Sequence, residues 1–233
     1  MYEKGDDLNI ALLDVHNKNY DKIAELAFPG KERYCEKHGY DFIRHTFTSL
    51  EPAHRGPTWG RVAALKEHLP KYDWILYLDT DTIILNKEIR IEDQLSEKNV
   101  VVGLMPEHQT GRPTHVSTSA ILMRSCDWSM SFIDDWYSQT QFIDNPYHNS
   151  NSKSTNGHGG LFLEQSAFHF MYDKTNGENI EIRYDSWFNY RYGTPGILKG
   201  SASLDSEFLV HFPRQDNKLQ RMKKFLSERV KVI

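Results

Sequence analysis

The chain has 233 residues, of which 39% are hydrophobic, 26% charged and 12% aromatic, and this balance is typical of a soluble globular protein with a full core. Its 28 basic and 32 acidic residues give a net charge of -4, which argues against a general nucleic-acid-binding protein, because such proteins usually carry a strongly basic face. We therefore expect residues 1–233 to form a single domain that meets any anionic ligand with a local group of basic side chains.

We expect no membrane-spanning or signal segment in this sequence, and we expect its two cysteines to stay unpaired. No apolar run reaches the roughly 18 to 20 residues that span a bilayer, and the first residues lack the apolar region of a signal peptide. The sequence also contains no Asn-x-Ser/Thr acceptor. These features favour a soluble, cytoplasmic protein, with a fragment of a luminal protein as the alternative. Cys35 and Cys126 fit no zinc-binding spacing, so we expect both to be buried and reduced.

Strands and helices alternate in the first part of the chain. The predicted elements are a strand at 8–13, a helix at about 20–38 that ends at Gly39, a strand at 40–45, a helix at about 58–68 and a strand at 74–78. The last of these strands is apolar without alternation, which is typical of a central parallel strand covered on both faces. This order predicts an α/β fold with right-handed crossovers and a doubly wound sheet that has helices on both faces.

The alternation is lost in the second part of the chain. The predicted elements are strands at 100–105 and 120–123, helices at about 128–139 and 164–172, strands at 180–183 and 208–212, and a helix at 218–230. Residues 140–160 are polar, and their length and composition favour a lid or loop. The last helix has one apolar face, so we expect it to pack on the sheet, although its basic residues also allow peripheral contact with an anionic membrane or a partner.

Asp79 and Asp81 follow the most apolar predicted strand. Ligands of open α/β sheets bind at the carboxyl ends of the strands, so the position agrees with a functional site. Two carboxylates held two residues apart repel each other unless a cation lies beside them, and the pair therefore predicts a divalent metal site. Such a metal would act as a Lewis acid on a diphosphate leaving group. A solvated turn is the alternative interpretation.

Further candidate ligands lie near the end of the chain. His211 falls within an apolar strand pattern, where a hydrogen-bonded core histidine is the alternative to a metal ligand. An imidazole next to carboxylate and phosphate oxygens suits Mn²⁺ better than Ca²⁺. Arg214 and Lys218 are candidates for binding phosphate, with a solvated basic stretch as the alternative.

Several of these segments together resemble a known family. The matching segments, in chain order, are Tyr34-Cys-Glu-Lys-His-Gly-Tyr40, Trp59-Gly-Arg61, Tyr72-Asp-Trp-Ile-Leu-Tyr-Leu-Asp-Thr-Asp81, Glu164-Gln-Ser-Ala167 and Val210-His-Phe212. They resemble the glycosyltransferase family that includes fungal galactosyl- and mannosyltransferases of the Golgi and plant xyloglucan xylosyltransferases. The resemblance extends over most of the chain. It implies the GT-A fold, a Rossmann-like arrangement around a mixed sheet.

The resemblance also implies roles for matching residues. Asp79 and Asp81 would bind the metal and the donor, and His211 would be a further metal ligand. Glu164 and Gln165 would lie at the sugar and the reaction centre. Asp14, just after the first predicted strand, would lie near the base or ribose of the nucleotide.

Three positions depart from the family pattern. Arg61 stands where the family has a donor-binding lysine, and its guanidinium can still bind phosphate with two hydrogen bonds. Ser117, Thr118 and Ser119 replace an Asn-Ser/Thr-Gly segment in the acceptor region, and Arg214 replaces a glycine. The identity of the substrate is therefore not carried over from the family.

The resulting hypothesis is a metal-dependent glycosyltransferase that uses Mn²⁺ or Mg²⁺. It would move a sugar from a nucleotide-diphosphate donor, with UDP favoured, to a hydroxyl of a glycan or glycoprotein, and the family precedent is retention of configuration. Glu164 as the general base of an inverting reaction is the mechanistic alternative. Two other classes stay open, namely a phosphatase of the haloacid-dehalogenase type, whose motif also has Asp-x-Asp after a strand, and a non-catalytic sugar- or nucleotide-binding module.

Overall fold

The computed structural model describes residues 8–47, 55–105, 115–143, 163–183, 207–213 and 217–230. Its strands are β1 (Ile10–His16), β2 (Asp41–Thr46), β3 (Trp74–Leu78), β4 (Thr82–Ile84), β5 (Val100–Met105), β6 (His115–Arg124), β7 (Ile180–Arg183) and β8 (Leu209–His211). Its α-helices are α1 (Asp21–His38), α2 (Gly60–His68), α3 (Asp127–Tyr137), α4 (Leu163–Lys174) and α5 (Lys218–Val230). Most elements predicted from the sequence are present.

The strands form one large and one small sheet. The six-stranded sheet has the order β2-β1-β3-β6-β5-β7. Strand β1 is parallel to β2 and β3, whereas β6 is antiparallel to β3 and β5, and β7 is parallel to β5. Strands β4 and β8 form a separate antiparallel pair. The predicted α/β fold with a mixed sheet is therefore confirmed, and β4 is an element that the sequence analysis missed.

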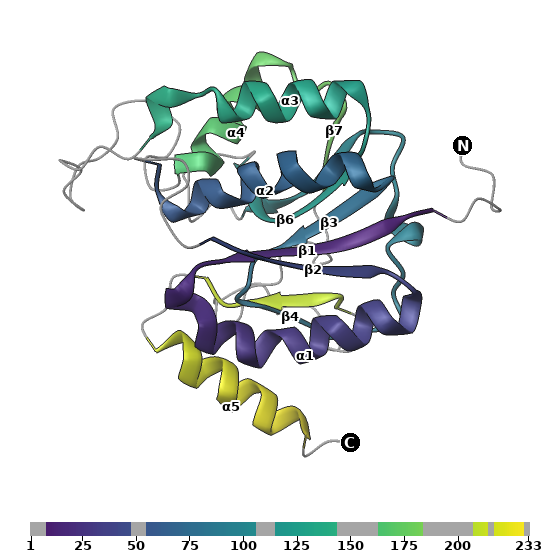
Figure 1. The fold of residues 1–233 in the computed structure, drawn as a ribbon, viewed down its shortest axis with the longest axis vertical. Helices are drawn as coiled ribbons and strands as arrows, with labels where there is room; N and C mark the ends of the chain where they lie inside the picture. The colour runs from purple at the N-terminus through teal and green to yellow at the C-terminus, as the bar shows by residue number, and fades with distance from the viewer. Residues whose placement is uncertain are drawn as a thin grey trace.

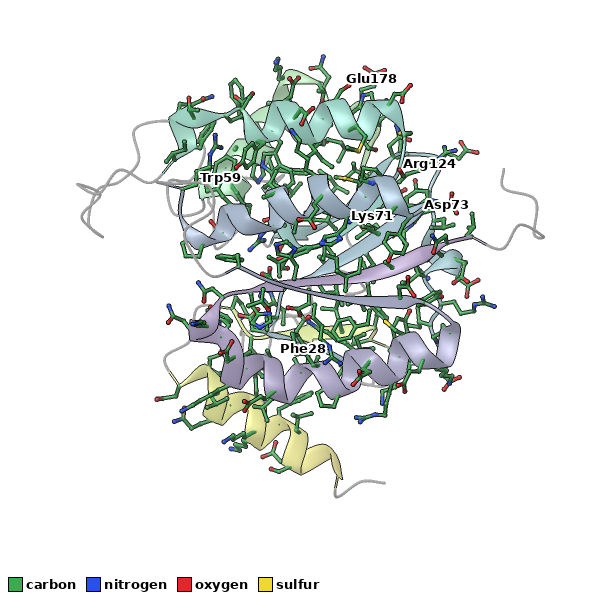
Figure 2. All side chains as sticks on the ribbon, viewed as in Figure 1. Phe28, Trp59, Lys71, Asp73, Arg124 and Glu178 are labelled. Atoms are coloured by element: carbon green, nitrogen blue, oxygen red, sulfur yellow. The ribbon has the colours of Figure 1, made fainter. Side chains whose placement is uncertain are left out.

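Helices cover both faces of the large sheet. Figure 1 shows α2, α3 and α4 on one face and α1 and α5 on the other, with β4 on the α1 side. The side chains of β3 alternate between two cores: Ile75 and Tyr77 pack toward α2, and Trp74, Leu76 and Leu78 pack on the α1 side. Figure 2 shows side chains filling both layers. The strand therefore reads as uniformly apolar because both of its faces are buried.

Two predicted boundaries are corrected by the sheet. Strand β1 extends to His16, so Asp14 lies inside the strand and not after it. Strand β6 begins at His115 and includes residues 117–119, which the sequence analysis placed before a strand at 120–123. Those three polar residues interrupt the apolar pattern that predicts a strand. Ser117 pairs with Gly103 of β5, and residues 118–119 fall where the register of the β5–β6 ladder shifts. The prediction for Cys126 is also corrected, because it is free like Cys35 but only partly buried.

The C-terminal helix packs on the body of the protein as expected. Met222 and Phe225 of α5 lie in a buried cluster with Ala27 of α1, Ile83 of β4 and Val210 of β8.

The predicted lid at 140–160 begins with a short 3-10 helix at Thr140–Phe142, and residues 144–160 lie outside the described part of the chain. None of the described helices has the length and apolar character needed to cross a membrane.

Two glycines, one in the middle of α1 and one at its C-terminal end, are expected to respond in opposite directions to substitution by alanine. Gly39 follows the helix with a φ of 74°, where a Cβ atom costs about 1–2 kcal/mol, so Gly39→Ala should lower the free energy of unfolding by that amount. Gly30 is helical and a Cβ there would meet no atom within 4 Å, so Gly30→Ala should raise it by about 0.5–1 kcal/mol. Urea unfolding of both variants tests this; equal effects would contradict it.

Candidate functional site

The Asp79-Thr80-Asp81 turn is held in place by main-chain hydrogen bonds. The N–H of Asp79 donates to the carbonyl of Ser119 in β6 at 2.8 Å, and the N–H of Thr82 donates back to the carbonyl of Asp79 at 3.1 Å. The N–H of Phe212, just after β8, donates to the carbonyl of Asp81 at 3.0 Å. The turn is therefore fixed between the large sheet and the small one.

Two carboxylates and an imidazole converge at this turn. Nε2 of His211 lies 3.2 Å from Oδ1 of Asp81 and 3.6 Å from Oδ2 of Asp79. The side chains of His211 and Asp81 are both 6% exposed, and that of Asp79 is 18% exposed. The potential ligand atoms all lie within 4.8 Å of one another, close enough for a single divalent ion to contact all three. The residues predicted as metal ligands thus lie together, and their binding of a metal stays a prediction.

The surroundings of the two carboxylates act on their charges in different ways. Burial raises the pKa of Asp79 above its usual value; Arg61 opposes the rise, and the neighbouring Asp81 carboxylate reinforces it. Burial alone would also raise the pKa of Asp81, but His211 and Lys218 outweigh it and hold that pKa below its usual range. The site therefore depends on positive charge beside the pair.

Two basic side chains supply part of that charge. Nη2 of Arg61 lies 3.1 Å from Oδ1 of Asp79, and Nη1 of the same residue lies 3.4 Å from Oε1 of Glu164. The ammonium group of Lys218, at the start of α5, donates to Oδ2 of Asp81 and, at 3.1 Å, to the hydroxyl of Tyr20. Both residues were predicted to bind the donor, and both lie at the carboxylates. The third basic candidate, Arg214, lies outside the described residues.

A buried ion pair supports the turn from the α1 side. Nζ of Lys31, on α1, donates to Oδ2 of Asp14 at 2.6 Å and to the carbonyl oxygen of Asp79 at 2.9 Å. Oγ1 of Thr80 donates to the other oxygen of Asp14 at 2.6 Å. Lys31 and Asp14 are both fully buried. This network joins α1, β1 and the turn into one unit.

The position of Asp14 differs from the one expected for a nucleotide ligand. Its carboxylate accepts hydrogen bonds from Lys31 and Thr80, and the side chain is fully buried. Burial of Asp14 argues against a direct contact with the base or ribose, and that contact stays a prediction. His16, two residues further along β1, instead lines the cavity beside the turn.

Glu164 and Gln165 lie in the first turn of α4 and contact the polar part of β6. Oγ1 of Thr118 donates to Oε1 of Glu164 and to Oε1 of Gln165, both at 3.3 Å. The hydroxyls of Ser117 and Ser119 share a hydrogen bond of 2.8 Å. The predicted reaction-centre and acceptor residues thus adjoin one another. All five are buried, so their contact with substrate stays a prediction.

A cavity of about 250 Å³ opens beside the carboxylates. Its lining consists of Val15, His16, Asn17, Asn19, Tyr20, Phe47, Pro57, Thr58, Arg61, Tyr77, Asp79, Thr80 and Asp81. The lining therefore combines aromatic rings, amides and hydroxyls with Arg61 and the two carboxylates. This mixture suits a ligand with a planar polar ring and an anionic group.

The sequence analysis missed Lys31 and most of the cavity wall. A signal for Lys31 was present, because it falls on the buried stripe of α1 with Ala24, Ala27, Tyr34 and Cys35, where a charged residue needs a buried partner. The cavity residues come from several loops and elements, and the signal for those after β1 was their place at the carboxyl end of a strand.

Comparison with known proteins finds a family match in the N-terminal part of the chain. Residues 9–115 match the galactosyl transferase GMA12/MNN10 family. Galactomannan galactosyltransferase 1 of Cyamopsis tetragonoloba is 28% identical over 132 residues, which are 53% of this chain and 29% of that protein. The alpha-1,2-galactosyltransferase of Schizosaccharomyces pombe is 26% identical over 98 residues, which are 38% of this chain and 26% of that protein. The matches span less than a third of these relatives' lengths. The resemblance predicted from the sequence is confirmed by this match, which covers residues 9–115.

Solved structures share the fold over nearly the whole chain. A glycosyltransferase involved in the glycosylation of the major capsid of PBCV-1 has a TM-score of 0.68 at 14% identity, over 93% of this chain and 99% of that one. The galactosyltransferase LgtC, in complex with donor and acceptor sugar analogs, has a TM-score of 0.56 at 11% identity, over 94% and 95% of the two chains. The GT-A fold is therefore confirmed.

Removal of the buried ammonium group of Lys31 is expected to destabilise the protein. Lys31→Met leaves the carboxylate of Asp14 buried without its cation, so the free energy of unfolding should fall by about 3–5 kcal/mol. Lys66→Met is the matched control, because the Lys66–Asp134 pair is about half exposed and should contribute no more than about 1 kcal/mol. Denaturant unfolding measures both changes, and a comparable small loss in the two variants would contradict the role given to Lys31.

Proposed function

We propose, from the match of residues 9–115 to the galactosyl transferase GMA12/MNN10 family, that this chain transfers a sugar from a nucleotide-diphosphate donor to a hydroxyl of a glycan. The observation that carries the proposal is the convergence of Asp79, Asp81 and His211 beside the cavity. Family and fold favour this activity over a haloacid-dehalogenase-type phosphatase or a non-catalytic binding module.

The three converging residues fit a divalent metal such as Mn²⁺ or Mg²⁺. Two carboxylates and one imidazole form a mixed oxygen and nitrogen donor set, which suits Mn²⁺ in particular. When bound, such an ion supplies Lewis-acid stabilisation of the charge that develops on a diphosphate leaving group. Two buried carboxylates next to each other also gain from the compensating charge.

Basic residues at the same place favour a diphosphate ligand. Arg61 places positive charge at Asp79, and Lys218 places positive charge at Asp81. Their role in this proposal is to bind phosphate oxygens, and the planar guanidinium of Arg61 can do so with two parallel hydrogen bonds. The ring-lined part of the cavity, with Phe47, Tyr77 and His16, would hold the nucleoside. We favour UDP because the family resemblance favours it.

Glu164 is the best candidate for the reaction centre. Its Oε1 atom is engaged by Arg61 and Thr118, whereas Oε2 is buried without a hydrogen-bond partner among the described residues. Since Arg61 also contacts Asp79, the same guanidinium connects the proposed donor side with the proposed reaction centre. A buried carboxylate oxygen without a partner can accept a hydrogen bond from a sugar hydroxyl or face developing positive charge.

Metal-dependent donor binding is the first expectation. In a thermal-shift screen of UDP-, GDP- and dTDP-sugars, a UDP-sugar should raise Tm only with Mn²⁺ present. Asp81→Asn removes a ligand charge and should weaken this binding by at least about tenfold. Asp135→Ala, an exposed carboxylate on α3, is the control and should keep the full shift.

Two outcomes of the screen would contradict the proposal. If the shift with UDP-sugar were equal with and without Mn²⁺, metal dependence would be wrong. If no nucleotide sugar shifted Tm at all, phosphate release from simple phosphate esters would be the assay to run next, since it would favour the phosphatase.

The stereochemistry of transfer provides a further test. We expect retention of the anomeric configuration, as the family precedent implies. Proton NMR of the first product formed from a donor of known configuration reports the anomer directly. An inverted product would assign Glu164 as a general base that activates the acceptor hydroxyl, because a single direct displacement inverts the carbon.

A further inference from the structure

A second group of potential metal ligands lies away from the Asp79 turn, where the edge strand β2 meets the end of α2. His45 is the penultimate residue of β2, and Glu67 and His68 are the last two residues of α2. His45 pairs in register with Val15 of β1, whose side chain belongs to the core on the α2 face. Residues far apart in sequence therefore meet on one side of the sheet.

The distances within this group are those of a preformed cation site. Nδ1 of His45 lies 3.0 Å from Nε2 of His68. The carboxylate of Glu67 spans the pair, with Oε1 3.5 Å from Nε2 of His68 and Oε2 4.0 Å from Nδ1 of His45. Two ligands bound to zinc at about 2.0–2.1 Å in a tetrahedral arrangement are about 3.3 Å apart. The observed separations bracket this value, so only small side-chain movements are needed.

The two imidazoles of this group are mostly buried, whereas the carboxylate of Glu67 is accessible to solvent. The side chains of His45 and His68 are 23% and 14% exposed, and their rings meet edge to face at 80°. The side chain of Glu67 is 55% exposed, so an ion can enter from solvent. Lys71, labelled in Figure 2, lies one turn further along, with Nζ 4.0 Å from Oε1 of Glu67. Its ammonium group is the cation that competes for this carboxylate.

We propose that His45, Glu67 and His68 form a second divalent-cation site, of the type that binds Zn²⁺. Two imidazole nitrogens and one carboxylate oxygen suit zinc better than Mn²⁺ or Mg²⁺, and water would complete the tetrahedron. The bound ion would join β2 to α2. Both elements lead to the cavity beside the Asp79 turn, since Phe47 follows β2 and Arg61 lies on α2 about 10 Å from His68 along the helix axis. This inference does not rest on the proposed transferase activity.

The competing explanation is a hydrogen bond between two neutral imidazoles on a charged surface. One N–H between the two nitrogens would account for the separation of 3.0 Å. That explanation predicts no selective affinity for zinc, so metal binding separates the two.

The test uses Asp81→Asn as the parent protein, because this substitution weakens metal binding at the Asp79 turn. Zinc should raise the Tm of this parent, and calorimetric titration should give one site. Adding His68→Gln, His45→Gln or Glu67→Gln should weaken zinc binding by at least about tenfold each. The side chain of Glu67 is exposed, so Glu67→Gln should fold normally. This variant therefore tests the site even if a histidine variant fails to fold. His38→Gln is the matched control, because His38 lies on α1 and outside the cluster, and this variant should bind zinc as the parent does.

The ligand type is checked with Co²⁺, which gives visible d–d bands when bound by nitrogen and oxygen and an additional charge-transfer band with a thiolate. Bands without the thiolate signature, lost with His68→Gln, would support the site and exclude the partly buried Cys126. Equal zinc binding by the parent and all three cluster variants, or no zinc binding by the parent, would overturn the proposal.

Discussion

The convergence of two carboxylates at the end of β3 is the constraint around which this structure is organised. Asp79 and Asp81 are too close and too buried to carry two charges without positive neighbours. The fold brings the cations Arg61 from α2 and Lys218 from α5, and it adds the imidazole of His211 from β8. Each compensating group belongs to a different element. The two buried carboxylates of one turn therefore interact with helices from both faces of the large sheet.

The main chain of the same turn depends on a second charge pair. Lys31 and Asp14 lie inside the protein, where an ion pair is tolerated only if its hydrogen bonds are satisfied. Here the ammonium group binds the carbonyl oxygen of Asp79, and the carboxylate accepts the hydroxyl proton of Thr80. The cost of burying two charges is thus offset at the point where the backbone must hold Asp79 and Asp81 in position. This explains a lysine within the apolar stripe of α1.

The short strands β4 and β8 bring the C-terminal part of the chain to the site. Thr82 of β4 pairs with His211 of β8, so the strand that leaves the turn places the imidazole beside the carboxylates. The α5 helix then packs through Met222 and Phe225 and brings Lys218 to Asp81. The pairing adds only a few residues to the sheet content. Its effect is to connect parts of the chain about 130 positions apart, as a site assembled from both halves requires.

Local periodicity, turn residues and the end of an apolar strand were enough to predict the α/β class, most helices and strands, and Asp79 and Asp81 as a pair. The family resemblance joined His211 to that pair. The antiparallel placement of β6, the strand β4, the Lys31–Asp14 pair and the His45–His68 contact were decided by the tertiary structure. Lys31 and Asp14 are 17 positions apart, and Lys218 and Asp81 are 137 apart. Such pairs form only when packing brings their elements together, and no local pattern specifies which partner a buried charge will meet.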